Sequence, residues 1–188
     1  MQHIWKTQAL SCLSWTLLAV GCQTVPVEEF PAHADPSAEL SKVEDGFEQA
    51  AAHQGAVLSP VNFRNMEKHL NAAKHERDEN AANTEILKEV ATAKAYLKRT
   101  DATIKVAQEV IPTVIEARRA AIAADAPDFD LKGLEAADKK LKSVTEDLEE
   151  NDKAPALKHR LDLQRDYAAV ELKALETSTT GPALHLKD

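Results

Sequence analysis

Residues that build broad globular cores and catalytic loops are scarce in this chain of 188 residues. It has five glycines, two cysteines, four phenylalanines, two tryptophans and two tyrosines. So few glycines leave little room for phosphate-cradling loops, and two cysteines exclude a framework of several disulfides. The hydrophobic residues are mostly Ala, Leu, Val and Ile. This composition predicts narrow seams between helices rather than a broad aromatic core.

Positive charge is also in short supply. The 23 lysines and arginines are outnumbered by 31 aspartates and glutamates, which gives a net charge of −8 at pH 7. No basic stripe runs along the chain, and phosphate binding requires one, so nucleic acid is excluded as a partner. The acidic balance also argues against electrostatic adsorption to anionic lipid.

The chain lacks the residue patterns of catalytic and metal sites. It has no Gly-x-Ser-x-Gly sequence, and His69 and His75 are six residues apart, which places them on different faces of a helix. The acidic run 146–152 lacks the glycine and alternating oxygen ligands of a calcium loop, and we interpret it as a solvated acidic corner. We therefore predict no catalytic residues, no metal and no cofactor, and a protein that is not an enzyme.

Residues 1–21 have the layout of an export signal peptide. Lys6 precedes an apolar stretch, 9–20, that is too short to span a bilayer, and small residues follow it up to Gly21 and Cys22. We predict cleavage between Gly21 and Cys22. The alternative is an ordinary secretory signal that is cut at a nearby small residue.

The sequence Leu18-Ala19-Val20-Gly21-Cys22 resembles the lipobox of bacterial lipoproteins. The resemblance implies that Cys22 is diacylated on sulfur, with chains such as palmitate, and acylated on its new amino group, so that these chains hold the protein in a membrane. Gln23 follows the cysteine in place of the aspartate that retains many such lipoproteins in the inner membrane. The resemblance therefore implies an outer-membrane lipoprotein on the periplasmic face. Residues 22–35 are then the lipidated amino terminus and a tether.

Residues 36–177 have the hydrophobic periodicity of helices, and we predict an all-α fold for them. The expected architecture is an elongated antiparallel bundle, or coiled-coil hairpins, of about five helices. Pro112 falls inside the third helix and predicts a kink or break near 108–111. Residues 178–188 lose the pattern, and we expect a loose tail. The expected helices are 37–54, 60–80, 84–124, about 127–150 and about 155–177.

Each expected helix carries an apolar stripe that we predict to be buried. In the third helix the stripe has heptad-like spacing from Ile86 to Val114 and then reaches Arg118, which either pairs with an acid across the bundle or marks the end of the buried stripe. We favour the second interpretation, because Pro112 resets the helical phase. In the last helix the stripe comprises Leu157, Leu161, Gln164, Ala168, Leu172 and Leu175.

Two helical hairpins are expected to be related by an internal repeat. Residues 68–73 (Lys-His-Leu-Asn-Ala-Ala) align with 132–137 (Lys-Gly-Leu-Glu-Ala-Ala), and each segment follows a proline turn, at Ser59-Pro60 and at Ala126-Pro127. Gly55 is expected to end the first helix.

A second resemblance rests on Glu116–Ile122, the Ala126-Pro127 turn, Leu134–Ala137, Ala154 and Tyr167–Leu172. These segments resemble an uncharacterised alanine-rich alpha-helical domain family of envelope lipoproteins in Gram-negative bacteria. Related segments lie upstream of OmpA-type peptidoglycan-binding domains. The resemblance covers roughly Ile86 to Glu176. It implies an all-α fold and an address in the cell envelope, and it supplies no catalytic residues.

Together these observations predict a non-enzymatic, periplasm-facing lipoprotein that acts as a structural or adaptor element of the cell envelope. It would act through contacts of its helices with another envelope protein or with itself. The alternative is a ligand-binding or carrier lipoprotein with an apolar groove between the helices. A cell-wall or lipid-active enzyme is the weakest of the three classes, since no convergent polar site is visible.

Overall fold

The computed structural model describes residues 25–31 and 33–184, and over these residues the chain is all-α, as predicted. The count of about five helices was too low, because the third expected helix is divided and two single-turn helices are present in addition. The helices are α1 (Pro36–Ala52), α2 (Gly55–Leu58), α3 (Pro60–Asp78), α4 (Asn83–Val110), α5 (Pro112–Ala123), α6 (Ala126–Phe129), α7 (Leu131–Glu149) and α8 (Ala154–Leu184).

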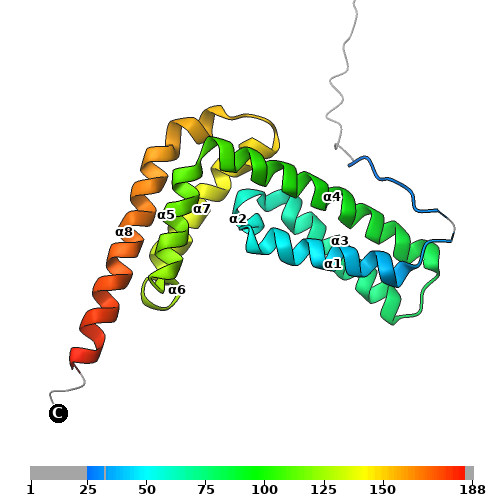
Figure 1. The fold of residues 1–188 in the computed structure, drawn as a ribbon, viewed down its shortest axis with the longest axis horizontal. Helices are drawn as coiled ribbons and strands as arrows, with labels where there is room; N and C mark the ends of the chain where they lie inside the picture. Colours follow the sequence, from blue (N-terminus) through cyan, green and yellow to red (C-terminus); the bar gives the residue numbers. More distant parts are fainter. Residues whose placement is uncertain (1–24, 32, 185–188) are drawn as a thin grey trace, which may run out of the picture.

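The helices form two arms that meet at a corner (Figure 1). In the first arm α1 packs against α3 and α4, and in the second arm α5 and α7 pack against α8. The short helix α2 contacts both α4 and α7, so it lies where the arms meet. The amino-terminal segment runs beside α4, and the end of α8 is the far tip of the second arm (Figure 1).

A cap and a buried stripe explain where α1 forms. The carboxylate of Asp35 accepts a hydrogen bond of 3.0 Å from the backbone N–H of Ser37, and Pro36 occupies the first turn, where its missing N–H costs nothing. The predicted stripes of the first three expected helices are buried in large part. The cluster at the outer end of the first arm comprises Leu40, Val43, Leu70, Ala73, Ile86, Val90 and Ala93.

The predicted interruption at Pro112 is a complete break between α4 and α5. Ile111 leaves the helical region with φ −131° and ψ 45°, and it caps both helices. Its N–H still donates to Ala107 and its carbonyl accepts from Val114 and Ile115. Pro112 has no N–H to continue the ladder, and its ring would clash with the preceding turn of a continuous helix.

The two halves of the chain repeat the same order of elements at a constant spacing of 71 residues. The non-glycine residues with left-handed φ are Gln54 and Asp125 before α2 and α6, and Asn80 and Asn151 after α3 and α7. Helices α2 and α6 each have 4 residues, and α3 and α7 each have 19. The sequence alignment of 68–73 with 132–137 was therefore wrong by two helical turns. A heptad pattern matches itself after a shift of seven residues, which explains the error.

Gly55 does not end α1 as expected. Gln54 adopts the left-handed conformation instead, with φ 65°, and Gly55 begins α2. The glycine is required by space, because a Cβ atom there would lie 2.7 Å from Cδ2 of Phe63 and 2.8 Å from the carbonyl oxygen of Ala50.

The stripe predicted for the last helix has the wrong phase. Its four leucines are exposed, by 50% at Leu157, 58% at Leu161, 58% at Leu172 and 46% at Leu175. The face of α8 that packs on α5 and α7 instead comprises Ala156, Leu163, Tyr167, Val170 and Ala174. Helix α8 thus carries two apolar stripes, and the one richer in leucine faces outward.

The loose tail expected from residue 178 is also corrected, because α8 continues to Leu184. Hydroxyl groups on this last stretch bond to the carbonyls of the preceding turn: Thr177 to Lys173 and Thr180 to Glu176, both at 2.8 Å. The end of the apolar pattern is therefore not the end of the helix. Residues 185–188 lie outside the described residues.

Candidate functional site

The predicted cleavage site at Gly21 and Cys22, the acylated Cys22 and the sorting residue Gln23 all lie outside the described residues. They remain predictions. The first described residue is Val25, three positions after Cys22. The position of Val25 therefore bears directly on how the predicted anchor is joined to the fold.

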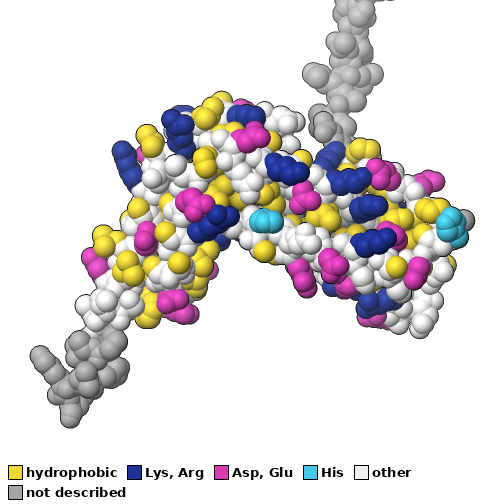
Figure 2. Space-filling model, viewed as in Figure 1, with side chains coloured by type: hydrophobic (Ala, Val, Ile, Leu, Met, Phe, Trp, Pro, Cys, Tyr) yellow, Lys and Arg dark blue, Asp and Glu magenta, His cyan; other side chains and the backbone are white. Residues whose placement is uncertain are grey.

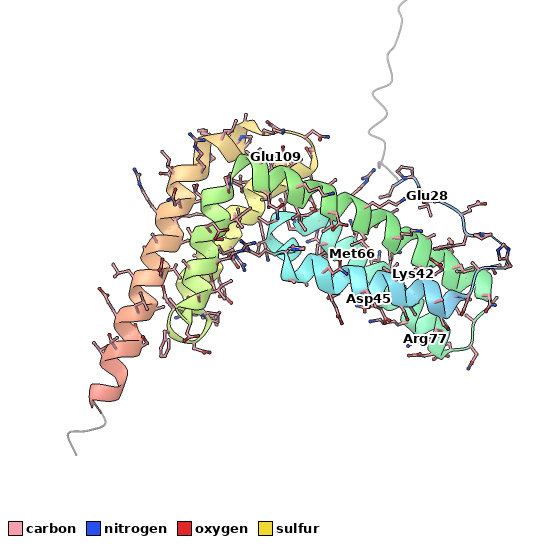
Figure 3. The ribbon with its side chains drawn as sticks, viewed as in Figure 1. Glu28, Lys42, Asp45, Met66, Arg77 and Glu109 are labelled. Carbon is pink, nitrogen blue, oxygen red and sulfur yellow. The ribbon has the colours of Figure 1, made fainter. Side chains whose placement is uncertain are left out.

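Residues 25–31, which we call the strap, lie against α4 and are fixed there. Val25 is only 8% exposed, and Glu28 accepts a bond of 2.7 Å from Nζ of Lys98 on α4. Phe30 packs against the buried cluster of the first arm, and Nζ of Lys94 lies 5.1 Å from the centre of its ring. Figure 3 shows Glu28 beside α4. The hydrogen bond and charge of Lys98 lower the pKa of the exposed Glu28 carboxyl.

The sequence predicts only a tether here, because the segment lacks helical periodicity. The missed signal is the apolar residues Val25, Val27 and Phe30 among prolines and acids; of these, Val25 and Phe30 are sheltered, whereas Val27 is exposed. Their role becomes visible only in the folded chain, where the strap packs on α4. Ala91 and Ala95 leave a shallow groove there, which Pro26 and Glu28 line from the strap side.

A buried polar cluster joins the two halves at the corner. Nε and Nη2 of Arg118 on α5 donate to the two carboxylate oxygens of Asp138 on α7, at 2.8 and 2.9 Å. The same carboxylate accepts a bond of 2.7 Å from the hydroxyl of Tyr167 on α8, which is fully buried. Nη1 of Arg118 donates to Gln54, in the turn between α1 and α2, at 2.9 Å. We call these four residues the corner cluster.

The corner cluster corrects the interpretation of Arg118 as the end of the buried stripe. Its side chain is 13% exposed and is paired across the bundle in a two-pronged contact with Asp138. Burial works against the charged form, but the bonds and charge of Asp138 outweigh it and raise the pKa of Arg118. Burial, together with the charge and hydrogen bond of Asp138, raises the pKa of Tyr167 well above its ordinary value of 10. Arg118 is therefore a cation and Tyr167 a neutral donor at neutral pH.

Glu149 makes a second bridge between the halves. From the end of α7 its carboxylate accepts bonds from the backbone N–H groups of Val61 at 3.2 Å and Asn62 at 2.9 Å, and from the hydroxyl of Ser59 at 2.6 Å. These are donors at the start of α3, where a negative charge is favourable. The acidic run was interpreted as a solvated corner; for Glu149 that was wrong.

The histidines that the sequence analysis considered are not brought together. His69 instead lies 2.7 Å from Glu89 and stacks on Tyr96, with 5.8 Å between ring centres. Within residues 25–31 and 33–184, no group of three or more His, Cys, Asp or Glu side chains is arranged to hold a metal ion.

A groove of about 630 Å³ lies between α7 and α8, next to the turn that joins them. Its lining is largely charged and includes Lys140, Asp147, Asp162, Arg165 and Asp166, with Val144 and Leu163 at its base. The alternative of an apolar carrier groove predicts a lining mostly of leucine and phenylalanine; this groove has Leu163 alone of these and is otherwise mainly polar.

None of the helices in the described ranges has an apolar stretch long enough to cross a membrane. Comparisons with protein-family models, curated proteins and solved structures find no match. The structural class defined by the chain itself is all-α.

Proposed function

We propose that this protein is a lipid-anchored helical adaptor of the bacterial envelope, which holds a rigid bent body close to a membrane for contact with another protein. The single observation that carries the proposal is the strap. It begins three residues after the predicted acylation site with the buried Val25, and it lies on α4 through the Glu28–Lys98 ion pair and the contact of Phe30 with Lys94.

The position of the strap limits how far the body can lie from the anchor. Three residues span at most about 11 Å in extended form. Acyl chains on Cys22 would therefore hold α4 beside the membrane surface and leave no long flexible leash. Two or more acyl chains give stable anchoring.

The corner cluster supports the same proposal. It joins the turn after α1 to α5, α7 and α8, and its charged groups are fully used within the protein. Arg118 and Asp138 are paired within the second arm, and the bond from Arg118 to Gln54 ties this pair to the end of α1 in the first arm. This bond helps to keep the two arms at a fixed angle. A fixed shape suits a protein that presents helix surfaces to a partner.

Two measurements test the anchor. Cells that express the full chain are labelled with radioactive palmitate and fractionated, with Cys22→Ser as the test variant and Cys12→Ser as the matched control. We expect label and outer-membrane location in the wild type and in Cys12→Ser, and loss of both in Cys22→Ser. Label retained in Cys22→Ser would refute the anchor.

The adaptor role is tested by in-cell crosslinking of the tagged, lipidated chain, followed by identification of the crosslinked proteins in the membrane fraction. We expect one dominant envelope protein that disappears in Cys22→Ser. A wild-type chain that crosslinks to nothing above background would overturn the adaptor role.

A further inference from the structure

The leucines of α8 form an exposed stripe with the spacing of a coiled-coil seam. The stripe runs from Leu157 to Leu175 and so extends about 27 Å along the helix. Successive residues are four, three, four, four and three positions apart, and the four leucines are each at least 46% exposed. Figure 2 shows yellow side chains along the outer edge of the arm that α8 forms in Figure 1. The members of the stripe are Leu157, Leu161, Gln164, Ala168, Leu172 and Leu175.

Three of the four equivalent positions in the first half are covered; the fourth, Asp101, which is equivalent to Leu172, is polar and exposed. The residues 71 positions before Leu157, Leu161 and Leu175 are Ile86, Val90 and Ile104, and these are 6%, 0% and 4% exposed. Ile86 and Val90 pack in a cluster with residues of α1. The second half retains large apolar residues at these positions but leaves them without a covering helix in this single chain.

The stripe reads nearly the same in both directions along α8. Leu157 mirrors Leu175 about position 166, and Leu161 mirrors Leu172 within one residue. Leucines therefore lie toward both ends and the shorter Ala168 near the centre. Two copies of α8 that run antiparallel would place leucine against leucine at both ends, as a two-fold axis requires.

Charges on the two flanks of the stripe are divided between its ends. Toward the start of α8 the flanks carry Lys158 and Arg160, and toward the end they carry Glu171 and Glu176. None of these four forms an ion pair with another residue in the described ranges. Arg165, nearer the centre, lies 3.5 Å from Asp162 of its own helix.

Helical spacing places Arg160 and Glu171 on one flank of the stripe, and Lys158, Arg165 and Glu176 on the other. In an antiparallel pair, each flank faces the same flank of the other copy. Arg160 then meets Glu171 and Lys158 meets Glu176, so each contact joins opposite charges. In a parallel pair, opposite flanks meet five residues apart along the chain, which sets Arg160 against Arg165 and Glu171 against Glu176. Charge thus favours the antiparallel arrangement and opposes the parallel one.

We propose that the exposed stripe of α8 is an interface with a second copy of this chain, which pairs with it antiparallel about a two-fold axis near residue 166. The pairing covers the leucines of both copies and satisfies their flanking charges. It does not depend on acylation of Cys22, so either proposal can fail without the other.

The test is sedimentation equilibrium of the purified full chain in a detergent matched in density to the solvent, so that only protein contributes to the buoyant mass. We expect a monomer–dimer equilibrium. The double variant Leu161→Asn/Leu172→Asn should weaken the dimer by about a hundredfold, because it removes apolar contact on both copies. The control Leu131→Asn, at a leucine of α7 that is 50% exposed and outside the stripe, should leave it unchanged.

Charge reversal tests the direction. Arg160→Glu should weaken the dimer roughly tenfold, because it sets two like-charged pairs against each other. Adding Glu171→Arg should restore it. In a parallel dimer, Arg160→Glu would strengthen association, because the introduced carboxylate would face Arg165 of the other copy. A monomer at every concentration, a dimer insensitive to the leucine variants, or strengthening by Arg160→Glu would overturn the proposal.

Discussion

Ser59 and Glu149 are separated by 90 positions in the chain, and the hydroxyl of one donates to the carboxylate of the other at 2.6 Å. Ser59 precedes α3 without capping it by its own side chain; Glu149, at the end of α7, supplies the acceptor instead. The start of a helix in the first half is thus completed by a side chain of the second half. Folding of α3 and docking of α7 are coupled by this contact.

Glu149→Gln should lower the free energy of unfolding by about 1 kcal/mol, and Glu149→Ala by about 2 kcal/mol. The amide keeps one acceptor oxygen but loses the charge that the start of α3 favours, and alanine leaves three donors without their acceptor. Urea denaturation followed by circular dichroism measures both. Glu150→Gln is the matched control, because Glu150 is exposed, and it should change the stability little. Equal effects at 149 and 150 would contradict the capping role.

Arg118→Leu should destabilise the protein by about 3 kcal/mol, because it leaves the partly buried Asp138 carboxylate without its cation. Arg118→Lys should fall between wild type and leucine, since lysine cannot make the two-pronged contact. The control is Arg119→Leu. Arg119 pairs with Glu116 at 2.6 Å, but both side chains are exposed, by 49% and 68%, so its loss should cost under about 0.5 kcal/mol. The comparison is made by urea denaturation, and similar losses at the two arginines would refute a special role for the corner cluster.

Tyr167→Phe should cost about 1 kcal/mol near neutral pH, because the ring still fills its place but Asp138 loses a donor. The cost should also depend on pH. The pKa of Tyr167 is raised in the folded protein, so above pH 10 the unfolded chain releases a proton that the folded chain retains.

This difference in proton binding means that the folded state loses stability as the pH rises above 10. The wild type keeps the contribution of Tyr167 in full below pH 10 and loses it as pH rises further, by up to about 1.4 kcal/mol per pH unit. The advantage of wild type over Tyr167→Phe should therefore shrink between pH 10 and 11. Urea denaturation of both proteins from pH 8 to 11 measures it, and a constant difference would contradict the assignment.

Gly55→Ala should destabilise the protein by about 1–3 kcal/mol. The added methyl group would meet the carbonyl oxygen of Ala50 at 2.8 Å, and this backbone atom cannot move aside cheaply. Gly46→Ala is the informative comparison, because there the methyl group meets only the end of the Leu97 side chain, which can rotate. The better helix propensity of alanine, worth about 1 kcal/mol, should offset that contact. Thermal melts of both variants test the difference, and equal losses would contradict it.

The sequence predicted the helices of the first arm well, because their buried stripes are the dominant apolar pattern of each segment. It also predicted an interruption before Pro112, since proline lacks an N–H wherever it stands, but a kink and a complete break were equally compatible with the sequence. It could not predict the phase of α8, which carries two apolar stripes. The predicted buried face followed the leucines. The face that is actually buried contains Tyr167 and Leu163, whose partners are distant in the chain.

The candidate site was less predictable for the same reason. In the sequence, Arg118 and Glu149 look like other surface charges of helical segments. Only the folded chain shows that Arg118 pairs with Asp138 and that Glu149 accepts hydrogen bonds from the start of α3. The strap offered a weaker signal, in Val25 and Phe30. Both are apolar residues outside any periodic pattern, so the surface on which they pack could not be predicted from the sequence.

The break at Ile111 has a mechanical consequence. A single continuous helix would transmit tension along its own hydrogen-bond ladder, but here the ladder stops between α4 and α5. Bending at the corner is therefore opposed by contacts between the arms: the Arg118–Gln54 hydrogen bond, the bonds of Glu149 to the start of α3, and the apolar core that both arms share. These contacts set the force at which the angle between the two arms opens.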